Sequence, residues 1–240
     1  DHIREIAQRI KPLVNVEVRK INVERAEGVE PTEPTPLADR SRFASRLTQG
    51  RWVTTVEILP PRGYDLTDTI DKARYLYRNG VDALNLPDGP RASSRLSPLF
   101  TALRVQQEAQ IEVILHFCCR DKNLIGMQAD LLACAAANVR NLLIVTGDPP
   151  KLGNYPFATG VFDVDSIGLC AIQRQLNQGI DIGGQAIRPA TEAVIGVGAD
   201  PTALDQDREE RRFRAKVENG AEFAITQPVF DRDALLRFLD

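Results

Sequence analysis

The stretch LLIVTGDPP at residues 142–150 is an apolar run that ends on a small residue, a carboxylate and two prolines. Such a run between turn-forming residues is typical of a buried strand in a parallel sheet. Five further runs also carry a polar or ionisable group near their end: VTTVEI with Glu57, ALNLPD with Asp88, VILHFCC with His116, VIGVGAD with Asp200 and FAITQPV with Gln227. Polar groups at every strand exit predict that one rim of a parallel sheet holds the chemistry.

The runs recur at a regular interval. They begin near residues 53, 83, 113, 142, 193 and 223, so the intervals are 30, 30, 29, 51 and 30 residues. About thirty residues is the length of a strand plus its returning helix. The long interval contains NQGIDIGGQAIRPATE (177–192), which we expect to be an inserted loop. The even spacing favours an α/β fold of the (β/α)8 TIM barrel type over a doubly wound open sheet, with the first six β/α units present.

Helical periodicity is visible between the runs. Return helices are predicted over 66–79, over 124–138, from a cap at Asp163 or Asp165 to Gln178, and over 204–219. The last residues, FDRDALLRFLD, fall in a sixth helix. Because a closed barrel needs about eight strands, we expect two further units from residues beyond this sequence or from another chain.

The first fifty residues have a different character. Apolar residues at helical spacing predict a short amphipathic helix over 1–14. The stretch GVEPTEPTPLA (28–38) is rich in Pro and Glu and is typical of an extended linker. One more helix is expected over 39–50, with a domain boundary near residue 45.

Composition narrows the functional class. The 240 residues include 30 basic and 33 acidic side chains, a net charge of -3 that gives no reason to expect nucleic acid. No run approaches about eighteen apolar residues, so we expect no membrane span, and the charged start DHIREIA is unlike a secretory signal. The sequence has four cysteines, which are Cys118, Cys119, Cys134 and Cys170. We expect them to be reduced in a cytoplasmic protein.

Two carboxylates are candidate catalytic groups. Glu57 lies between apolar neighbours in VEILPPR, which predicts a raised pKa and a general acid near neutral pH. The alternative is a structural glutamate that pairs with Arg62. Asp148 follows Gly147, which lets a ligand approach the backbone, and precedes two prolines that turn the chain away. Its alternative is a turn-forming aspartate.

Other polar side chains suit binding. His116 lies on one face of its strand and is either a ligand contact or a satisfied core histidine. Gln227 carries both donors and an acceptor, which suits an amide or pteridine-like edge. Lys216 could reach a phosphate or flavin oxygen, or be a surface lysine. No set with metal-ligand spacing is present, so no metal is predicted, and GVGADP (196–201) lacks the third glycine of a dinucleotide fingerprint.

Across roughly residues 52–240 the sequence resembles the methylenetetrahydrofolate reductase family. The matching segments occur in the family's order: VEILPPR, LHFCCRDKN, LLIVTGDPPKLG and KVENGAEFAITQPVFD. The chain looks most like the reductase half of a bifunctional protein whose first half is a homocysteine S-methyltransferase. On that resemblance, residues 1–27 are a remnant of the preceding domain, 28–45 the linker and 46–240 the reductase barrel.

The resemblance implies a flavoprotein of one-carbon metabolism and methionine biosynthesis. FAD is the implied cofactor and NAD(P)H the co-substrate, and 5,10-methylenetetrahydrofolate is reduced to 5-methyltetrahydrofolate. Glu57 matches the family's proton-donating acid, and Asp148 an aspartate beside both flavin and folate. Gln227 matches a folate-contacting position. The matching flavin-contacting positions are Asp88, His116, Thr146, Gly147, Asp148 and Lys216.

Some residues depart from the family's pattern. Thr146 stands where many members have Arg, which removes a cation near the flavin phosphates, and Arg91, Arg120 and Lys151 could supply that charge instead. The alternative function is a non-catalytic reductase-like subunit that binds folate or a partner protein. A pterin-binding methyl transferase without flavin is a third class, with no corrinoid or zinc ligand set to favour it. The expected partners are a folate and an N-terminal methyltransferase domain, and a homo-oligomer stays open.

Overall fold

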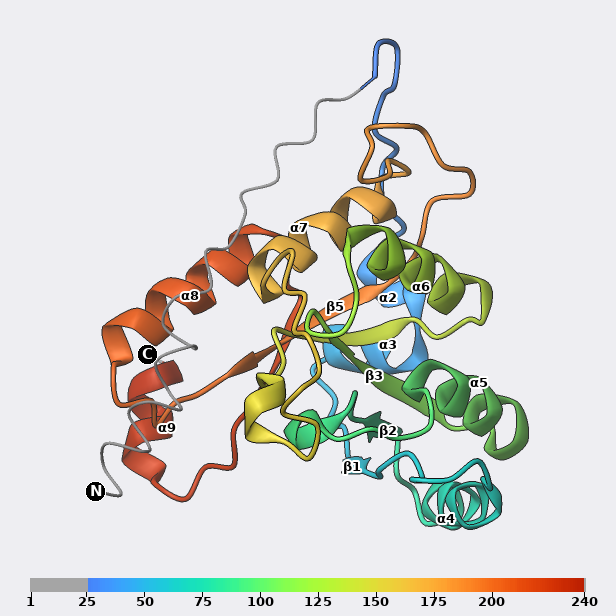
Figure 1. Cartoon of the computed structure of the whole chain (residues 1–240), viewed down its shortest axis with the longest axis vertical. Helices are drawn as coiled ribbons and strands as arrows, with labels where there is room; N and C mark the ends of the chain where they lie inside the picture. Colours follow the sequence, from blue (N-terminus) through green and yellow to red (C-terminus); the bar gives the residue numbers. More distant parts are fainter. Residues whose placement is uncertain (1–25, 240) are drawn as a thin grey trace.

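The computed structural model describes residues 26–239 and contains a six-stranded parallel sheet (Figure 1). The strands follow sequence order across the sheet, and all six predicted runs are confirmed as strands. The strands are β1 (Thr55–Glu57), β2 (Ala83–Leu86), β3 (Glu112–Cys118), β4 (Asn141–Val145), β5 (Val194–Ala199) and β6 (Phe223–Thr226). A doubly wound sheet would reverse its strand order at a switch point, so the sequential order is that of a partial barrel. The helix predicted over 1–14 lies outside the described residues.

Helices return the chain between the strands and lie on the outer face of the sheet. They are α4 (Thr67–Arg78), α5 (Pro98–Ala109), α6 (Leu124–Ala136), α7 (Ser166–Asn177) and α8 (Gln206–Glu218), and α9 (Arg232–Leu239) follows β6. The sequence analysis missed α5, although Ser97 caps its first turn and Pro98 occupies its first position. Asp165 caps α7, whereas Asp163 accepts from the Leu124 amide at the start of α6.

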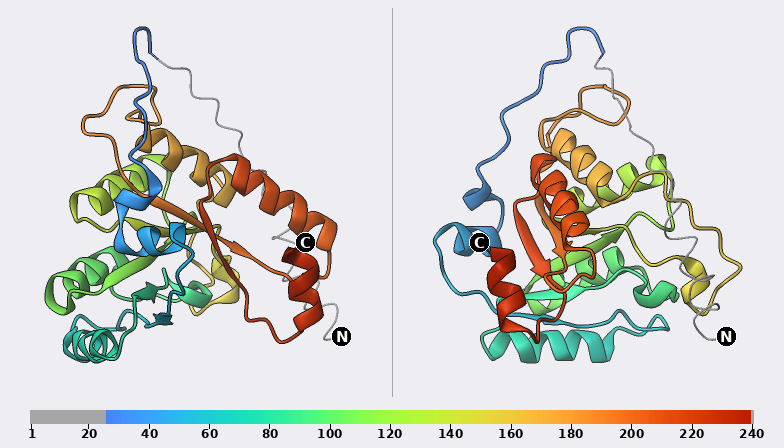
Figure 2. Two further views of the ribbon diagram at one scale, coloured as in Figure 1. Left: turned by 180° about the vertical axis from the view of Figure 1, so that it is seen from behind. Right: turned by 90° about the vertical axis from the view of Figure 1, so that its left-hand side faces the viewer.

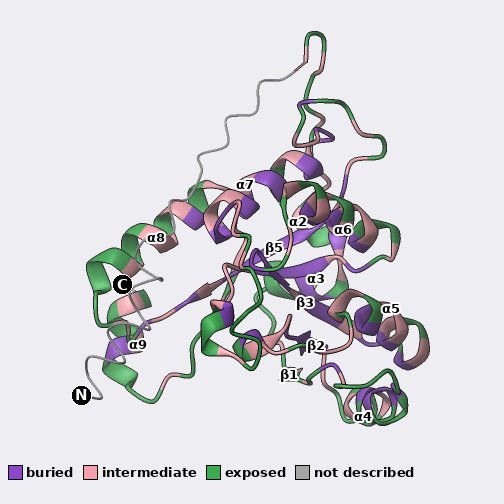
Figure 3. Cartoon of the chain, viewed as in Figure 1, coloured by how far each residue is buried: buried purple, intermediate pink, exposed green. Residues whose placement is uncertain are grey.

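The two faces of the sheet pack differently. The outer face and the helices share a large core that includes Leu84, Leu115, Ile144 and Ile195. A smaller cluster occupies the inner face, where Phe43 meets Ala83, Ile114 and Leu143, with Phe223 and Ile225 at its margin. Figure 3 shows the buried residues concentrated in the central strands, while α8 and α9 are largely exposed.

Two short helices cover the N-terminal end of the strands. They are α2 (Leu37–Arg40) and α3 (Arg42–Thr48), so the helix predicted over 39–50 is confirmed as α3, while positions 39 and 40 belong to the separate helix α2. Ser41 separates them, because its extended backbone ends α2 while its side chain accepts from the Ala44 amide. The ring of Phe43 packs edge-on against Phe223 with centroids 5.0 Å apart. Figure 2 shows both helices (blue) in front of the strands when the molecule is seen from behind.

Residues 26–35, which span the end of the expected remnant (1–27) and the start of the expected linker (28–45), are attached to the insertion that precedes β5. The Thr32 amide donates to Gln178 O at 2.8 Å, and the Ala26 amide donates to Gly184 O at 3.1 Å. The insertion holds one isolated antiparallel bridge, between Ile180 and Ala186, and no helix. The predicted inserted loop is therefore confirmed, and it gives the preceding segment a surface to lie on.

Candidate active site

The C-terminal ends of the strands form one rim, and several candidate side chains point to the same face there. Glu57 is paired in register with Asn85, two residues after the inner-face residue Ala83. His116 follows the inner-face residue Ile114 by two positions, and Gln227 follows Ile225 in the same way. Since side chains alternate along a strand, Glu57, Asn85, His116 and Gln227 all lie on the inner face.

Glu57 ends β1 and is exposed. The apolar enclosure that the sequence predicted is therefore absent, because its apolar neighbours in sequence alternate onto other faces. The predicted alternative, a pair with Arg62, is not formed either. Within residues 26–239 the carboxylate has no hydrogen-bond or ion-pair partner, so it faces the concave side with its acceptor capacity unused.

His116 and Asn85 form a polar pair on the inner face. His116 Nε2 lies 3.3 Å from Asn85 Oδ1, and Asn85 Nδ2 donates to Thr55 Oγ1 at 2.9 Å. Burial lowers the pKa of His116 from 6.5 to about 4, so the ring is neutral near pH 7. A neutral imidazole offers one donor and one acceptor. The sequence analysis overlooked Asn85, although an amide inside the run ALNL was a signal for it.

Gly147 and Asp148 bring the backbone of β4 close to β3. Gly147 has φ +93°, and a Cβ there would lie 2.0 Å from Cys118 Sγ. Only glycine fits this approach to Cys118, and the predicted approach of a ligand to Gly147 stays a prediction. Asp148 is exposed, and its carbonyl accepts from Arg120 Nη1 at 3.2 Å. Its carboxylate has no partner in the described part of the chain and remains available at the rim.

Arg120 holds three rim loops together. Its guanidinium donates to both oxygens of Asp121 at 2.7 Å, and also to Gly89 O at 3.3 Å and to Asp148 O. The side chain is buried, with 4% of the residue exposed. The prediction that Arg120 supplies free positive charge to a cofactor is therefore wrong, because neighbouring acceptors neutralise the charge. Arg91 and Lys151, the other two candidates, are exposed.

Three further candidates contribute to the structure of the rim. The Thr146 hydroxyl accepts from the Ser166 amide at 3.1 Å, which fixes the start of α7. Lys216 is buried and donates to Gly198 O at 2.7 Å, and burial lowers the pKa of its ammonium group. Asp88 accepts from the Cys118 amide at 3.1 Å, and burial raises the pKa of its carboxyl group. A surface position for Lys216 was therefore wrong.

No cluster of metal-ligating side chains occurs among residues 26–239. The four cysteines are free and buried, and burial raises the pKa of the Cys118 thiol to about 12. None of the helices in this range is long and apolar enough to cross a membrane.

The six-stranded partial barrel carries the exposed side chains of Glu57, Asp148 and Gln227 at its C-terminal rim, where barrel proteins build their sites from the βα loops. The family model of methylenetetrahydrofolate reductase matches residues 42–240. The chain therefore belongs to the methylenetetrahydrofolate reductase family, and its matched range covers all six strands.

Two curated relatives are similar at low identity. A protein of Oryza sativa subsp. japonica, named probable methylenetetrahydrofolate reductase (NADH), is 24% identical over 196 residues, which is 80% of this chain and 32% of that protein. Methylenetetrahydrofolate reductase 1 of Schizosaccharomyces pombe is 24% identical over 152 residues, 62% of this chain and 23% of that protein. The chain thus spans a third or less of the length of these relatives.

Solved structures share the fold alone. Phosphonopyruvate hydrolase in complex with oxalate and Mg++ has a TM-score of 0.55 at 17% identity, covering 84% of this chain and 66% of that one. The 2,3-dimethylmalate lyase of the PEP mutase/isocitrate lyase superfamily has a TM-score of 0.57 at 13% identity, covering 86% and 67%.

Proposed function

We propose that the complete protein reduces 5,10-methylenetetrahydrofolate to 5-methyltetrahydrofolate with NAD(P)H and FAD. The observation that carries the proposal is the family match over residues 42–240 on a fold that turns Glu57, His116 and Gln227 to one face of one rim. The rice relative's name specifies NADH, so NADH is the first donor to test. The reaction would place the protein in one-carbon metabolism and methionine biosynthesis, in the cytoplasm.

An open position at the end of β5 and several hydrogen-bond donors at the rim support the proposal of a bound flavin. A Cβ built at Gly198 meets nothing within 4 Å, so the end of β5 is open. His116, Lys216 and the backbone at Thr146 and Gly147 would hold the cofactor, with Asp88 beneath the neighbouring loop. FAD, when bound, would supply hydride transfer between NAD(P)H and the folate.

Glu57 would deliver a proton to the folate nitrogen as the five-membered ring opens. Its carboxyl group is exposed at the end of β1 and has no partner among the described residues, so it is free to meet a substrate. Positioned acids of this kind contribute about 10²- to 10⁴-fold to a rate. A bound folate would exclude water from the carboxyl group and favour its protonated form.

Asp148 and Gln227 would complete the substrate contacts. The Asp148 carboxylate, unpartnered within residues 26–239, would stabilise the cationic iminium form of the opened folate. Gln227 extends the β5–β6 pairing, because its backbone N–H donates to Ala199 O at 2.8 Å. This bond fixes the backbone from which the Gln227 side chain projects, and the side-chain carboxamide would pair with the edge of the pterin ring.

A non-catalytic reductase-like subunit that binds folate or a partner is the second candidate. It is favoured by Thr146, whose hydroxyl turns to α7, and by Arg120, whose charge is already neutralised. If the protein is a reductase, the exposed cations Arg91 and Lys151 have to neutralise the flavin phosphates without help from Arg120 or from residue 146.

The organisation of the complete protein also stays a proposal. We propose closure of the barrel to eight strands, a preceding methyltransferase-like domain that ends near residue 27, a linker over 28–45 and self-association.

An absorption spectrum of the complete protein separates the two candidates. The reductase should be yellow as purified or after addition of FAD, and NADH should bleach its band near 450 nm. A colourless protein that takes up no FAD would exclude the reductase and leave the non-catalytic subunit.

A further inference from the structure

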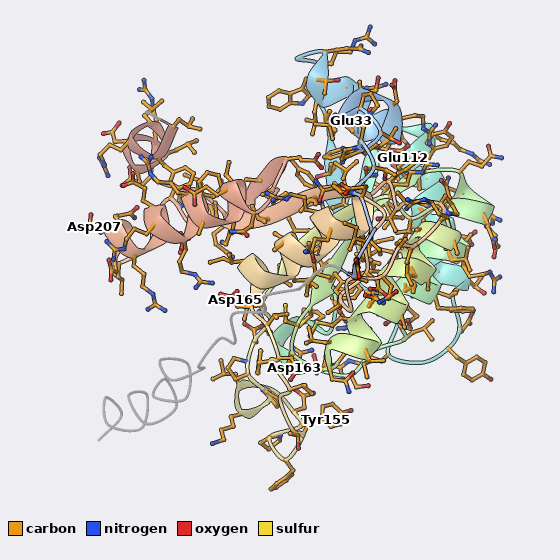
Figure 4. All side chains as sticks on the ribbon, turned by 90° about the horizontal axis from the view of Figure 1, so that it is seen from above. Glu33, Glu112, Tyr155, Asp163, Asp165 and Asp207 are labelled. Carbon is orange, nitrogen blue, oxygen red and sulfur yellow. The ribbon has the colours of Figure 1, made fainter. Side chains whose placement is uncertain are left out.

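A separate cavity of about 380 Å³ opens at the rim between the loops that follow β2, β3 and β4. We call it the Arg95 cavity, and its walls include Gly89, Ser94, Arg95, Asp121 and Tyr155. Figure 4 shows Tyr155 at the end of the molecule opposite Glu112, which starts β3. Of the proposed reductase residues only Asp88 lines the cavity, so it adjoins the proposed site without coinciding with it.

The guanidinium group of Arg95 has an N–H without an acceptor among the described residues. Its Nη1 donates to Pro60 O at 2.9 Å, which anchors the side chain to the loop after β1. Its Nε is buried and has no acceptor among the described residues, and no carboxylate in that range forms an ion pair with it. The positive charge of this guanidinium is therefore unpaired among the described residues, and an anion bound in the cavity that Arg95 lines would pair with it.

The start of α5 adds positive potential to the same place. Pro98, the first residue of this twelve-residue helix, lines the cavity, and the Ser97 side chain accepts from the Phe100 amide. The N-terminal end of a helix favours negative charge. The hydroxyl of Ser94, which is exposed at the cavity wall, adds a donor that can turn toward a ligand.

The cavity wall is held in an unfavourable backbone conformation. Arg91 and Ala92 have φ values of +55° and +50°, although neither is glycine. The neighbouring loop fixes this turn, because a Cβ at Gly153 would lie 2.4 Å from the carbonyl oxygens of both residues. Strain of this kind persists where the surrounding structure enforces it, and it is concentrated at ligand-binding sites.

Two carboxylates also line the cavity, and neither forms an ion pair with Arg95. Asp121 receives two hydrogen bonds from Arg120. Asp88 accepts from the Cys118 amide, and burial raises the pKa of its carboxyl group. Arg95 is therefore the cation at this cavity that lacks a carboxylate partner within residues 26–239.

We propose that the Arg95 cavity binds an oxyanion, with the Arg95 guanidinium as its main ligand and the start of α5 and Ser94 as supporting groups. Two sources share this chemistry, the phosphates of a nucleotide and the carboxylates of a folate's glutamate tail. Which source applies depends on the proposed function, whereas anion binding at Arg95 does not.

Calorimetry on the complete protein tests this site with two probes, inorganic pyrophosphate and the dipeptide γ-glutamylglutamate. Arg95→Gln should weaken binding of the preferred probe about 10- to 100-fold, the range expected for a charge-assisted hydrogen bond. Arg104→Gln is the matched control, since Arg104 lies on α5 and pairs with Glu108, and it should change binding less than about twofold.

A second variant guards against misfolding of the first. Ser94→Asp keeps Arg95 and alters an exposed side chain, and it should weaken the same probe by charge repulsion. A preference for pyrophosphate assigns the cavity to a nucleotide, and a preference for the dipeptide assigns it to the folate tail. Binding of neither probe, or binding that Arg95→Gln and Ser94→Asp leave unchanged, overturns the proposal. Anion binding by a protein that takes up no FAD would instead refute the reductase and retain this site.

Discussion

The two ends of the parallel strands differ in how their polar groups are used. At the N-terminal end, the Glu112 carboxylate accepts from the amides of Arg42 and Phe43 at 2.9 and 2.8 Å. Arg40 is buried there and pairs with Glu222 at 2.8 Å. At the C-terminal rim, the carboxylate of Glu57 has no partner in the described range.

The N-terminal end of the sheet contributes stability, and the C-terminal rim carries the groups proposed for chemistry. Satisfied polar groups around Phe43 close the N-terminal end and fix the helices α2 and α3 to it. The carboxylates of Glu57 and Asp148 at the rim are exposed and make no such contacts within residues 26–239, so they contribute little to stability and are accessible to a ligand. In barrel folds the C-terminal face carries the site and the opposite face contributes stability, and the proposed site in this chain agrees with that division.

The largest expected effect comes from replacing, one at a time, two glutamates at opposite ends of the sheet with glutamine. Glu57→Gln should lower folate reduction by about 10²- to 10⁴-fold with little change in the free energy of unfolding, because its carboxylate has no partner to lose. Glu112→Gln should lower that free energy by about 1–2 kcal/mol, since one of its oxygens becomes an amide group facing backbone donors, while the turnover of folded molecules stays the same. Steady-state kinetics and urea unfolding of both variants check these two predictions. Equal losses of activity in the two variants would contradict a catalytic role for Glu57 and a structural role for Glu112.

Phe43→Ala should destabilise the N-terminal end. The ring is buried against Ala83, Ile114, Leu143 and Phe223, and truncation of a buried Phe costs about 3–5 kcal/mol. The measurement is urea unfolding followed by far-UV circular dichroism. Trp52→Ala is the control, because that side chain is 88% exposed. A small effect of Phe43→Ala would mean that α2 and α3 are not part of the cooperative core.

Acid should destabilise the protein through His116. Because its pKa falls from 6.5 to about 4 on folding, the unfolded state binds a proton between those values and the folded state does not. The stability present above pH 6.5 is therefore lost as the pH falls to about 4, by about 3 kcal/mol. The free energy of unfolding of the parent minus that of His116→Asn, measured from pH 7 to pH 4, separates the contribution of His116 from that of Asp88. A difference that does not change with pH would contradict the lowered pKa of His116.

The smallest expected effect belongs to a surface ion pair. Arg42 lies 3.4 Å from Glu112, but its side chain is 62% exposed. Arg42→Ala keeps both backbone donors to Glu112 and should cost less than about 1 kcal/mol. A loss as large as that of Phe43→Ala would show that charge, rather than packing and backbone hydrogen bonds, stabilises the N-terminal end.

Much of the fold was predictable because it follows from local patterns. Six apolar runs at a common interval predicted the six strands, and the start of α7 was predicted at a cap by Asp163 or Asp165, of which Asp165 is the cap. The helix Pro98–Ala109 was missed because it follows a loop rich in Ser and Arg, and its start signal is confined to Ser97 and Pro98. The break at Ser41 was not predicted either, although serine is a common N-cap and its side chain accepts from the Ala44 amide. The same hydroxyl also donates to Asn141 Oδ1 on β4, a contact that the local sequence does not reveal.

The site was less predictable, since its geometry depends on contacts between units. The residue types at the rim were evident from the sequence, but the pairing of Asn85 with His116 requires the register of two strands. Arg120 looked like a free cation because its acceptors come from three loops. The exposure of Glu57 depends on which face its neighbours occupy, and sequence proximity to apolar residues could not reveal that.

The separate half-reactions of the Glu57→Gln variant test the central claim most directly. In stopped-flow absorbance at 450 nm, NADH should bleach the flavin of the variant at nearly the parent rate, because that step needs no proton from residue 57. Return of the colour on adding methylenetetrahydrofolate should be slowed by about 10²-fold or more. Return of the colour at the parent rate would show that Glu57 is not the acid and that the unpartnered carboxylate at the rim has no catalytic role.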